Sequence, residues 1–333
     1  MKEQTYLSAE LDSADQNVRY DAAVKRVLAT RCILARILVG TVPEFRDYSY
    51  EEAEKAIIGT PEIASRRVRP DARNRTEAVQ SLGTDSRLPG EGEVTFDIVF
   101  SVLTGKGEPQ KMYINIEAQK SVQLPYDLVS RSIFYPARLM SEQLDREFTT
   151  SSYDKIKKVY SIWICMNSPA KSVKRLAVDT IVQYGITPKV IYPTENLPKM
   201  SFGRYDLFST IFINLTADGS TTGDELIGML STLLSEVIDT DTKKKILEER
   251  YHIPMVKTVD EEVQGMCNLS EGIVERTTER VKNEMDKKYS GIISEKDRTI
   301  SEKGQALCEK DQALSEKDQE IARLKKLLAE AGK

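Results

Sequence analysis

Three polar side chains near the middle of the chain have the types and spacing expected of a divalent cation site. Glu117 and Gln119 lie two residues apart in the run Tyr-Ile-Asn-Ile-Glu-Ala-Gln-Lys, and Asp97 is the lone charge in an earlier run of β-branched and aromatic residues. Oxygen ligands of this kind suit Mg²⁺, with Mn²⁺ as an alternative ion. The residues alone leave a second interpretation open, in which all three are edge-strand polar groups facing water.

The strand that carries Glu117 should present two different faces, because side chains alternate along a strand. One face is apolar and is expected to enter a core: Met112, Ile114, Ile116 and Ala118. The opposite face carries the polar set: Tyr113, Asn115, Glu117 and Gln119. Residues 94–102 are predicted to form the preceding strand, and the glycines at 105 and 107 predict the turn of a hairpin. Such a hairpin would bring Asp97 beside Glu117.

An aspartate on one strand followed by Glu-x-Lys or Glu-x-Gln on the next resembles the PD-(D/E)xK nuclease superfamily, with Ile-Glu-Ala-Gln as the Gln-bearing variant. Longer blocks at residues 131–144, 155–165 and 266–270 look like those of the PD-(D/E)xK nuclease-family transposases, relatives of the recombination-promoting nucleases. The resemblance covers residues 15–275. The sequence departs from it at Gln119, where the superfamily usually has lysine, and Lys120 lies one residue later on the opposite strand face.

The resemblance implies a restriction-endonuclease-like α/β fold, with a mixed central sheet flanked by helices. It also implies a metal-dependent DNA endonuclease that hydrolyses phosphodiester bonds in transposition or recombination. Asp97 and Glu117 would hold the metal, and the neutral Gln119 could orient the attacking water without acting as a cationic stabiliser. The alternative is a relative with weakened or lost catalysis that serves as a DNA-binding or oligomeric interaction module.

Basic residues cluster locally, although the net charge of the chain is −4. Five arginines within ten residues are the best candidates for contacts with DNA phosphates: Arg66, Arg67, Arg69, Arg73 and Arg75. They fall in the polar segment 59–92, which is expected to form a long loop or a frayed insertion before the site strands. Arg131 is a further candidate that could steady phosphate or the site carboxylates. The alternatives are a solvated face for the cluster and a salt bridge to a neighbour such as Asp127 for Arg131.

Composition excludes several other classes of protein. The chain of 333 residues is 40% hydrophobic and 30% charged, which is ordinary for a globular protein. It lacks a run of about 18 apolar residues and a signal-peptide pattern, so we expect a cytoplasmic protein without a membrane partner. The four cysteines lack Cys-x-x-Cys spacing and His252 is the single histidine, which argues against a zinc site or a histidine-dependent triad.

Helical patterns surround the expected site strands. Residues 20–38 are predicted to form one helix that stops at Gly40. The family resemblance implies that this helix can carry an additional polar site residue, and Asp21 and Lys25 lie one turn apart on one face; the alternative, which we favour, is a surface ion pair. Residues 125–144 are predicted to form a helix that Pro136 kinks or splits. Its expected apolar stripe comprises Tyr126, Val129, Ile133, Ala137, Met140 and Leu144. Two buried strands at 159–166 and 207–215, and helices at 224–238 and 243–250, would complete the domain.

The chain is expected to divide into a nuclease-like domain, residues 1–275, and a charged helical tail, residues 276–333. A seven-residue repeat in the tail keeps one apolar position: Ile293, Ile300, Leu307, Leu314, Ile321 and Leu328. The second position that a coiled coil needs is occupied by lysine, glycine or aspartate until Leu324, so the seam is weak. The tail could form a homo-oligomer through these heptads or remain a solvated single helix.

Overall fold

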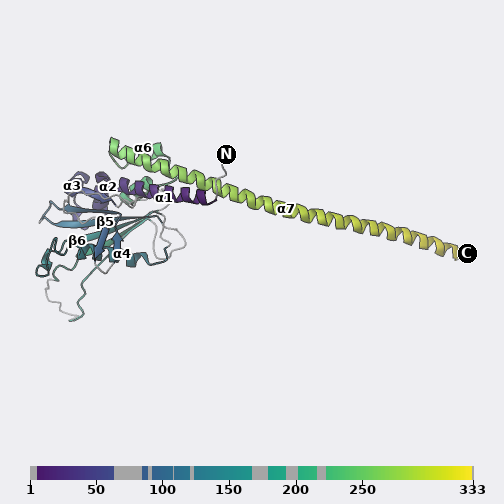
Figure 1. The fold of residues 1–333 in the computed structure, drawn as a ribbon, viewed down its shortest axis with the longest axis horizontal. Coiled ribbons are helices and arrows are strands. Elements are labelled where there is room, and N and C mark those ends of the chain that lie inside the picture. The colour runs from purple at the N-terminus through teal and green to yellow at the C-terminus, as the bar shows by residue number, and fades with distance from the viewer. Residues whose placement is uncertain are drawn as a thin grey trace. The chain divides into compact units, whose positions relative to one another are not determined.

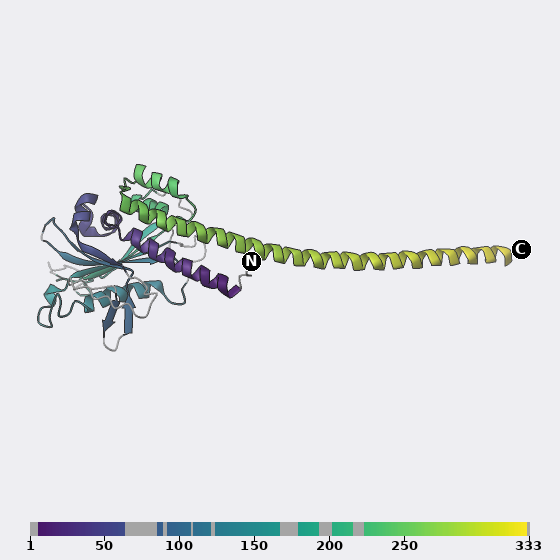
Figure 2. The ribbon, with the colours of Figure 1, turned by 45° about the horizontal axis from the view of Figure 1, so that its top comes forward.

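A computed structural model describes residues 6–63, 85–88, 92–107, 109–120, 124–166, 179–192, 202–215 and 223–331. The chain divides into two compact units, Met1–Ile273 and Val274–Lys333. The first unit is a mixed α/β domain in which helices flank a six-stranded mixed sheet, as the sequence predicted at this level (Figures 1 and 2). None of the helices among the described residues is both long and apolar enough to cross a membrane.

The six-stranded sheet has the order β1-β4-β5-β6-β8-β7. Its strands are β1 (Ile57–Ile63), β4 (Ile98–Leu103), β5 (Lys111–Gln119), β6 (Lys158–Cys165), β7 (Thr180–Gly185) and β8 (Phe208–Asn214). The central strands β5, β6 and β8 are parallel, whereas the β1–β4, β4–β5 and β7–β8 pairs are antiparallel. The near-continuous apolar runs of β6 and β8 were predicted as strands, and burial on both faces of a parallel sheet explains that composition.

The hairpin that carries the expected site is confirmed, but its first strand begins later than predicted. β4 pairs with β5 so that Ile98 lies opposite Ile116. Upstream, β3 (Gly92–Thr95) belongs to a separate two-stranded sheet with β2 (Asp85–Leu88). The prediction of one strand over 94–102 is therefore wrong. The segment 59–92, expected to be a long loop or a frayed insertion, contributes its first residues to β1 and residues 85–88 to β2, and its residues 64–84 lie outside the described part of the chain. Phe96, at the junction of the two sheets, is fully buried and packs edge-on against Tyr135 with ring centroids 5.2 Å apart.

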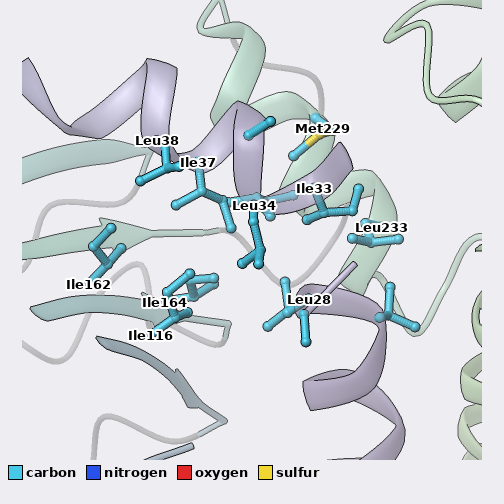
Figure 3. Packing of buried hydrophobic residues seen from close by; sticks show 14 of the residues in the cluster. Leu28, Ile33, Leu34, Ile37, Leu38, Ile116, Ile162, Ile164, Met229 and Leu233 are labelled. Atoms are coloured by element: carbon cyan, nitrogen blue, oxygen red, sulfur yellow. The ribbon is translucent and has the colours of Figure 1, made fainter. Parts of the chain in front are cut away.

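Helices α1 (Tyr6–Leu28), α2 (Arg31–Thr41) and α5 (Glu225–Leu234) cover one face of the sheet. In Figure 3, Leu34 of α2 and Leu28 of α1 approach the strand residues Ile116 and Ile164, and Leu233 of α5 packs beside them. The apolar face predicted for β5 lies in this core. Each fully buried aliphatic side chain contributes about 1.5–3 kcal/mol, so this layer is the main source of stability.

The predicted single helix over 20–38 is two helices. Thr30 separates α1 from α2 with an extended backbone, ψ 135°, and its hydroxyl donates to the Val27 carbonyl oxygen over 2.7 Å. This side-chain bond competes with helix continuation. Gly40, which was expected to stop the helix, lies inside α2. A Cβ at Gly40 would come within 2.6 Å of Leu226, so glycine there permits the close packing of α2 against α5.

Shorter elements complete the first unit. They are η1 (Pro43–Phe45), α3 (Tyr50–Ala56), η2 (Tyr153–Lys155) and α6 (Thr240–Glu249). A capping box formed by Ser49 and Glu52 starts α3. Asp224 and Asp239 cap α5 and α6 by accepting backbone N–H bonds.

Helix α4 (Leu128–Ser141) covers the opposite face of the sheet (Figure 1). It continues through Pro136, so the predicted split is wrong. Proline removes the N–H that would bond to the Ser132 carbonyl, and the hydroxyl of Thr210 on β8 donates to that carbonyl over 2.7 Å instead. The lost helical bond is thus replaced from the sheet.

The face of α4 that packs on the sheet is not the predicted apolar stripe. Ile133 and Leu144 of that stripe are exposed, whereas Tyr135, Leu139 and the charged Arg138 are buried. The sheet surface below the helix is itself partly polar, with Asn115, Glu117, Ser161 and Thr210 buried there. A mixed polar face on the helix therefore matches a mixed polar face on the sheet.

Helix α7 (Lys257–Ala331) begins in the first unit and supplies the second. In residues 257–273 the helix buries Val259, Val263, Met266 and Cys267 in the core. In Val274–Lys333 the described heptad positions are solvent-exposed by 49–68%: Ile293, Ile300, Leu307, Leu314 and Ile321. The tail is helical as expected, and its assembly as a coiled coil stays a prediction.

Candidate functional site

The two carboxylates singled out by the sequence lie side by side where β4 meets β5. The backbone N–H of Asp97 donates to Oε1 of Glu117 over 3.1 Å. In return, Oδ2 of Asp97 accepts a hydrogen bond from the backbone N–H of Ala118 over 3.0 Å. Two acidic side chains are thereby held together at the carboxyl end of β5.

The local fold explains why Asp97 can do this from outside a strand. The β4–β5 ladder ends at the Ile98–Ile116 pair, and the buried Phe96 ring anchors the chain just before it. Asp97 sits in the bend, so its side-chain carboxylate takes the place of a backbone acceptor and extends the ladder by one bond. The sequence predicted Asp97 within the strand, whereas it lies in the bend before β4. In both positions Asp97 lies next to Glu117.

Lys25 of α1, for which the sequence favoured a surface ion pair, also contacts the carboxylate pair. Its Nζ lies 2.7 Å from Oδ1 of Asp97 and 2.8 Å from Oδ2 of Asp21. The expected Asp21–Lys25 pair exists, but Lys25 bridges it to the carboxylate pair. Lys25 directly follows Val24, which is fully buried, and lies two residues before Val27, which is also buried. A lysine at the edge of a buried helix face was the signal that could have found it.

Gln119 and Lys120 lie at the end of β5 with different surroundings. Gln119 is the last residue of the strand, and strand alternation puts its side chain on the same face as Glu117. The backbone carbonyl oxygen of Gln119 accepts a hydrogen bond from the Met166 backbone N–H over 3.0 Å. The ammonium group of Lys120 instead pairs with Glu236 at 2.8 Å and lies 4.8 Å from the Tyr20 ring centroid. Lys120 therefore serves a different contact.

Arg131 of α4 is fixed by aromatic side chains rather than by a salt bridge to Asp127. Its Nη1 donates to the Tyr126 hydroxyl over 2.7 Å, and its Nε and Nη2 donate to the Tyr135 hydroxyl over 3.1 and 2.6 Å. The guanidinium carbon also lies 5.3 Å from the Trp163 ring. Asp127 accepts from the Ser130 N–H as the N-cap of α4. Arg131 thus places a fixed positive charge near Glu117.

Burial raises the pKa of both carboxyl groups, and the rise is larger for Glu117. Burial raises the pKa of Glu117 well above its usual range, and the neighbouring charge of Asp97 adds to this rise, while the Asp97 N–H and Arg131 oppose it. Burial also raises the pKa of Asp97, against the opposing charge of Lys25. The 2.7 Å ion pair with Lys25 keeps Asp97 as the ionised partner, so Glu117 is the group that takes up a proton.

The donor chemistry of this pair fits Mg²⁺ or Mn²⁺. The described residues contain no cluster of three or more His, Cys, Asp or Glu side chains arranged to hold a metal ion. Magnesium, however, is commonly bound through one or two protein carboxylates together with water and substrate phosphate. Asp97 and Glu117 supply such a pair. Because the pKa of Glu117 is raised, a metal ion would compete with a proton for this carboxyl group.

The predicted phosphate-contact arginines lie outside the described residues, in the segment 64–84: Arg66, Arg67, Arg69, Arg73 and Arg75. Comparison with protein-family models, curated proteins and solved structures finds no match to this chain. The class that fold and site define is a mixed α/β protein with a carboxylate pair at the carboxyl end of a central strand.

Proposed function

We propose that this protein is a metal-dependent endonuclease that hydrolyses phosphodiester bonds of DNA, in a restriction-endonuclease-like fold. The observation that supports this most is the contact between Asp97 and Glu117 at the carboxyl end of β5. In sheets with parallel strands, ligands bind outside the carboxyl ends of the strands. Lys25 compensates the charge of Asp97, whereas ionising the buried Glu117 beside Asp97 costs free energy that a bound cation would offset.

The charged and the neutral side chains of the site would have different roles. Asp97 and Glu117 would hold the metal ion. When bound, such an ion polarises a phosphate and lowers the pKa of a coordinated water molecule. Gln119 offers an amide donor and acceptor on the same face, suited to orienting a water molecule or a phosphate oxygen. Arg131 lies close enough to Glu117 to favour its ionised form, which promotes metal binding.

The choice of DNA and of transposition or recombination rests on the sequence resemblance. The arginine cluster at 66–75 would contact DNA phosphates. A nicking assay on supercoiled plasmid, with and without Mg²⁺, tests the proposal directly. Asp97→Asn is the matched control, since it keeps the shape of the side chain. Cleavage that survives in Asp97→Asn would come from a contaminant and would count against the proposal.

A second candidate function is that of an oligomeric DNA-binding module with weak catalysis. The exposed apolar side chains at every seventh position of the tail support self-association through a coiled coil. Gel-shift titration of the purified protein without metal separates this function from the first. Tight DNA binding with no Mg²⁺-dependent nicking would favour it.

A further inference from the structure

A cavity of about 160 Å³ lies among the helices that cover the sheet on the face opposite α4. Its lining comes from α2, the start of α3, the start of α5 and the loop after α6. An apolar cavity of about 150 Å³ can hold a benzene molecule, so this one has room for about six to eight non-hydrogen atoms. The cavity shares no residue with the carboxylate pair.

Arg36 of α2 brings a buried positive charge to this cavity. Its side chain donates through Nη1 to the Cys32 carbonyl over 2.9 Å, and through Nη2 to the carbonyls of Tyr251 and His252 over 3.1 and 2.7 Å. The guanidinium carbon lies 4.5 Å from the Tyr50 ring centroid. Its Nε–H is buried and has no hydrogen-bond partner among the described residues. Because carbonyl dipoles and a ring supply only partial charges, this guanidinium favours an anionic group as a further partner.

Tyr251 adds a second buried donor to the same lining. The residue is 3% exposed, and its hydroxyl has no hydrogen-bond partner among the described residues. A Cβ at Gly228 would overlap that hydroxyl, so glycine there lets the tyrosine lie against α5. A hydroxyl removed from water without a partner costs free energy. A ligand with an acceptor group would satisfy it.

Two carboxylates at the start of α5 also line the cavity, those of Asp224 and Glu225. Oε1 of Glu225 accepts from the Tyr50 hydroxyl over 3.0 Å, and Oδ1 of Asp224 accepts from the Ile227 N–H over 2.9 Å. A simple anion would meet repulsion from these carboxylates, whereas a simple cation would meet repulsion from Arg36. A small molecule that carries both charges suits the lining best.

The remaining wall is aliphatic: Val39, Leu226 and Met229. We propose that the cavity binds a free α-amino acid with a small aliphatic side chain, of about the size of alanine or valine. The carboxylate of the ligand would accept from Nε of Arg36 and from the Tyr251 hydroxyl. Its ammonium group would face Asp224 and Glu225, and its side chain would lie against the aliphatic wall. This site is independent of the proposed endonuclease function.

A simpler role for these groups must be separated from ligand binding. Water could fill the cavity and satisfy both buried donors, while Arg36 would only fasten α2 to residues 251 and 252. That role predicts a loss of stability when Arg36 is replaced, and so does ligand binding. The test therefore measures the ligand directly and leaves Arg36 in place.

The full-length protein is titrated with L-valine in a calorimeter and melted with and without it. Two analogues each lack one charge: 3-methylbutanoate has no ammonium group, and 2-methylpropan-1-amine has no carboxylate. We expect valine to bind with a Kd of about 10 µM to 1 mM, as a ligand of this size allows, and to raise the melting temperature. Each analogue should bind at least about tenfold more weakly, because it leaves one charge of the site without its partner.

Two variants place the ligand in the cavity. Tyr251→Phe removes one hydroxyl and keeps the ring, so it should weaken valine binding about tenfold or more, since the lost bond is to a charged group. Glu225→Gln removes one charge and keeps the shape, and should weaken binding about threefold to tenfold. Tyr289→Phe, at an exposed tyrosine of the tail, is the matched control and should bind valine like the wild type.

A folded wild type that shows neither heat nor a melting shift at about 10 mM valine, tenfold above the weakest expected Kd, overturns the proposal and leaves water in the cavity. Binding of 3-methylbutanoate as tight as that of valine also overturns it. So does unchanged valine binding in both variants, because the ligand would then bind elsewhere. If Tyr251→Phe does not fold, Glu225→Gln decides alone. Nicking of DNA enters none of these measurements, so failure of the endonuclease function is a separate result.

Discussion

The backbone N–H of Asp97 donates to Oε1 of Glu117 over 3.1 Å, and this bond ties the residue that precedes β4 to the carboxyl end of β5. Because the Ala118 N–H returns a bond to Oδ2 of Asp97, the end of the β4–β5 hairpin and the site are one structure. Substitutions that keep the shape of either side chain should therefore change charge more than fold.

We expect Asp97→Asn and Glu117→Gln each to abolish Mg²⁺-dependent cleavage, because an amide cannot supply the negative charge that a hard cation requires.

Gln119→Ala should slow cleavage about tenfold to a thousandfold with Mg²⁺ affinity little changed, since it removes only a neutral hydrogen-bonding group. Single-turnover nicking and calorimetry measure both effects. A Glu117→Gln protein that binds the ion as tightly as its parent would contradict the assignment.

The stability of the protein should depend on pH through Glu117. Folding raises the pKa of this carboxyl above its ordinary 4.5, so its contribution to stability is fully present below pH 4.5 and is lost as pH rises through the folded-state pKa. Each unit of the rise corresponds to about 1.4 kcal/mol. Glu117→Gln should therefore gain stability over the wild type between acidic and neutral pH. Urea unfolding at several pH values measures this, and a gap that shrinks with rising pH would contradict it.

Arg131 should assist metal binding by favouring the ionised form of Glu117. We expect Arg131→Met to weaken Mg²⁺ binding several-fold at pH 6.5, and less at pH 8.5 where protons compete less. Tyr126→Phe is the matched control, because it removes one hydroxyl partner of Arg131 and leaves the charge. Equal effects of the two variants at both pH values would show that packing, rather than charge, is responsible.

Neutralising Arg66, Arg67 and Arg69 to glutamine should weaken DNA binding and flatten its salt dependence. Each lost phosphate contact lowers the slope of log affinity against log salt by about one unit. The control is a triple lysine-to-glutamine change at Lys296, Lys303 and Lys310 of the tail, which alters the net charge equally. A slope that stays the same in the arginine variant would leave this cluster as a solvated face.

Removal of residues 274–333 should leave the first unit folded, because the α7 side chains described as buried, from Val259 to Ser270, precede this boundary. A cut after residue 268 would also remove Leu269 and Ser270, which pack with the core. We expect the melting temperature to stay within about 2 °C of that of the full chain. Light scattering should show fewer chains per particle than for the full-length protein. Leu307→Asp with Leu314→Asp in the full chain should reduce the mass in the same way, and an insoluble truncated protein would place the tail in the core.

Parts of the fold that follow from alternation and apolar runs could be read from the sequence. The two faces of β5 and the buried strands β6 and β8 are as predicted, and the Asp97–Glu117 contact follows from the hairpin. These features depend on local patterns that burial enforces. Edge strands such as β1 and β7 were missed, since half-exposed strands carry a weaker apolar signal.

Features set by tertiary contacts could not be read in the same way. The orientation of α4 depends on the polar side chains of the sheet beneath it, and its continuity through Pro136 depends on a hydroxyl from β8. The role of Lys25 depends on which acid α1 approaches, while the i,i+4 spacing to Asp21 offered a sufficient local partner. In both cases the residues are visible in the sequence, but the tertiary partner that decides which contact they make is not.

Trp163 is the single tryptophan of the protein, and on β6 it lies directly opposite Glu117 in the strand pairing. Its indole N–H donates to the Ser161 hydroxyl over 2.9 Å, and the Arg131 guanidinium lies 5.3 Å from its ring. Indole emission responds to nearby charge and polarity, so the protein contains its own optical reporter of this site. Proton uptake by Glu117 or cation entry should shift the emission of one fluorophore, with no label attached and no second tryptophan to obscure the signal.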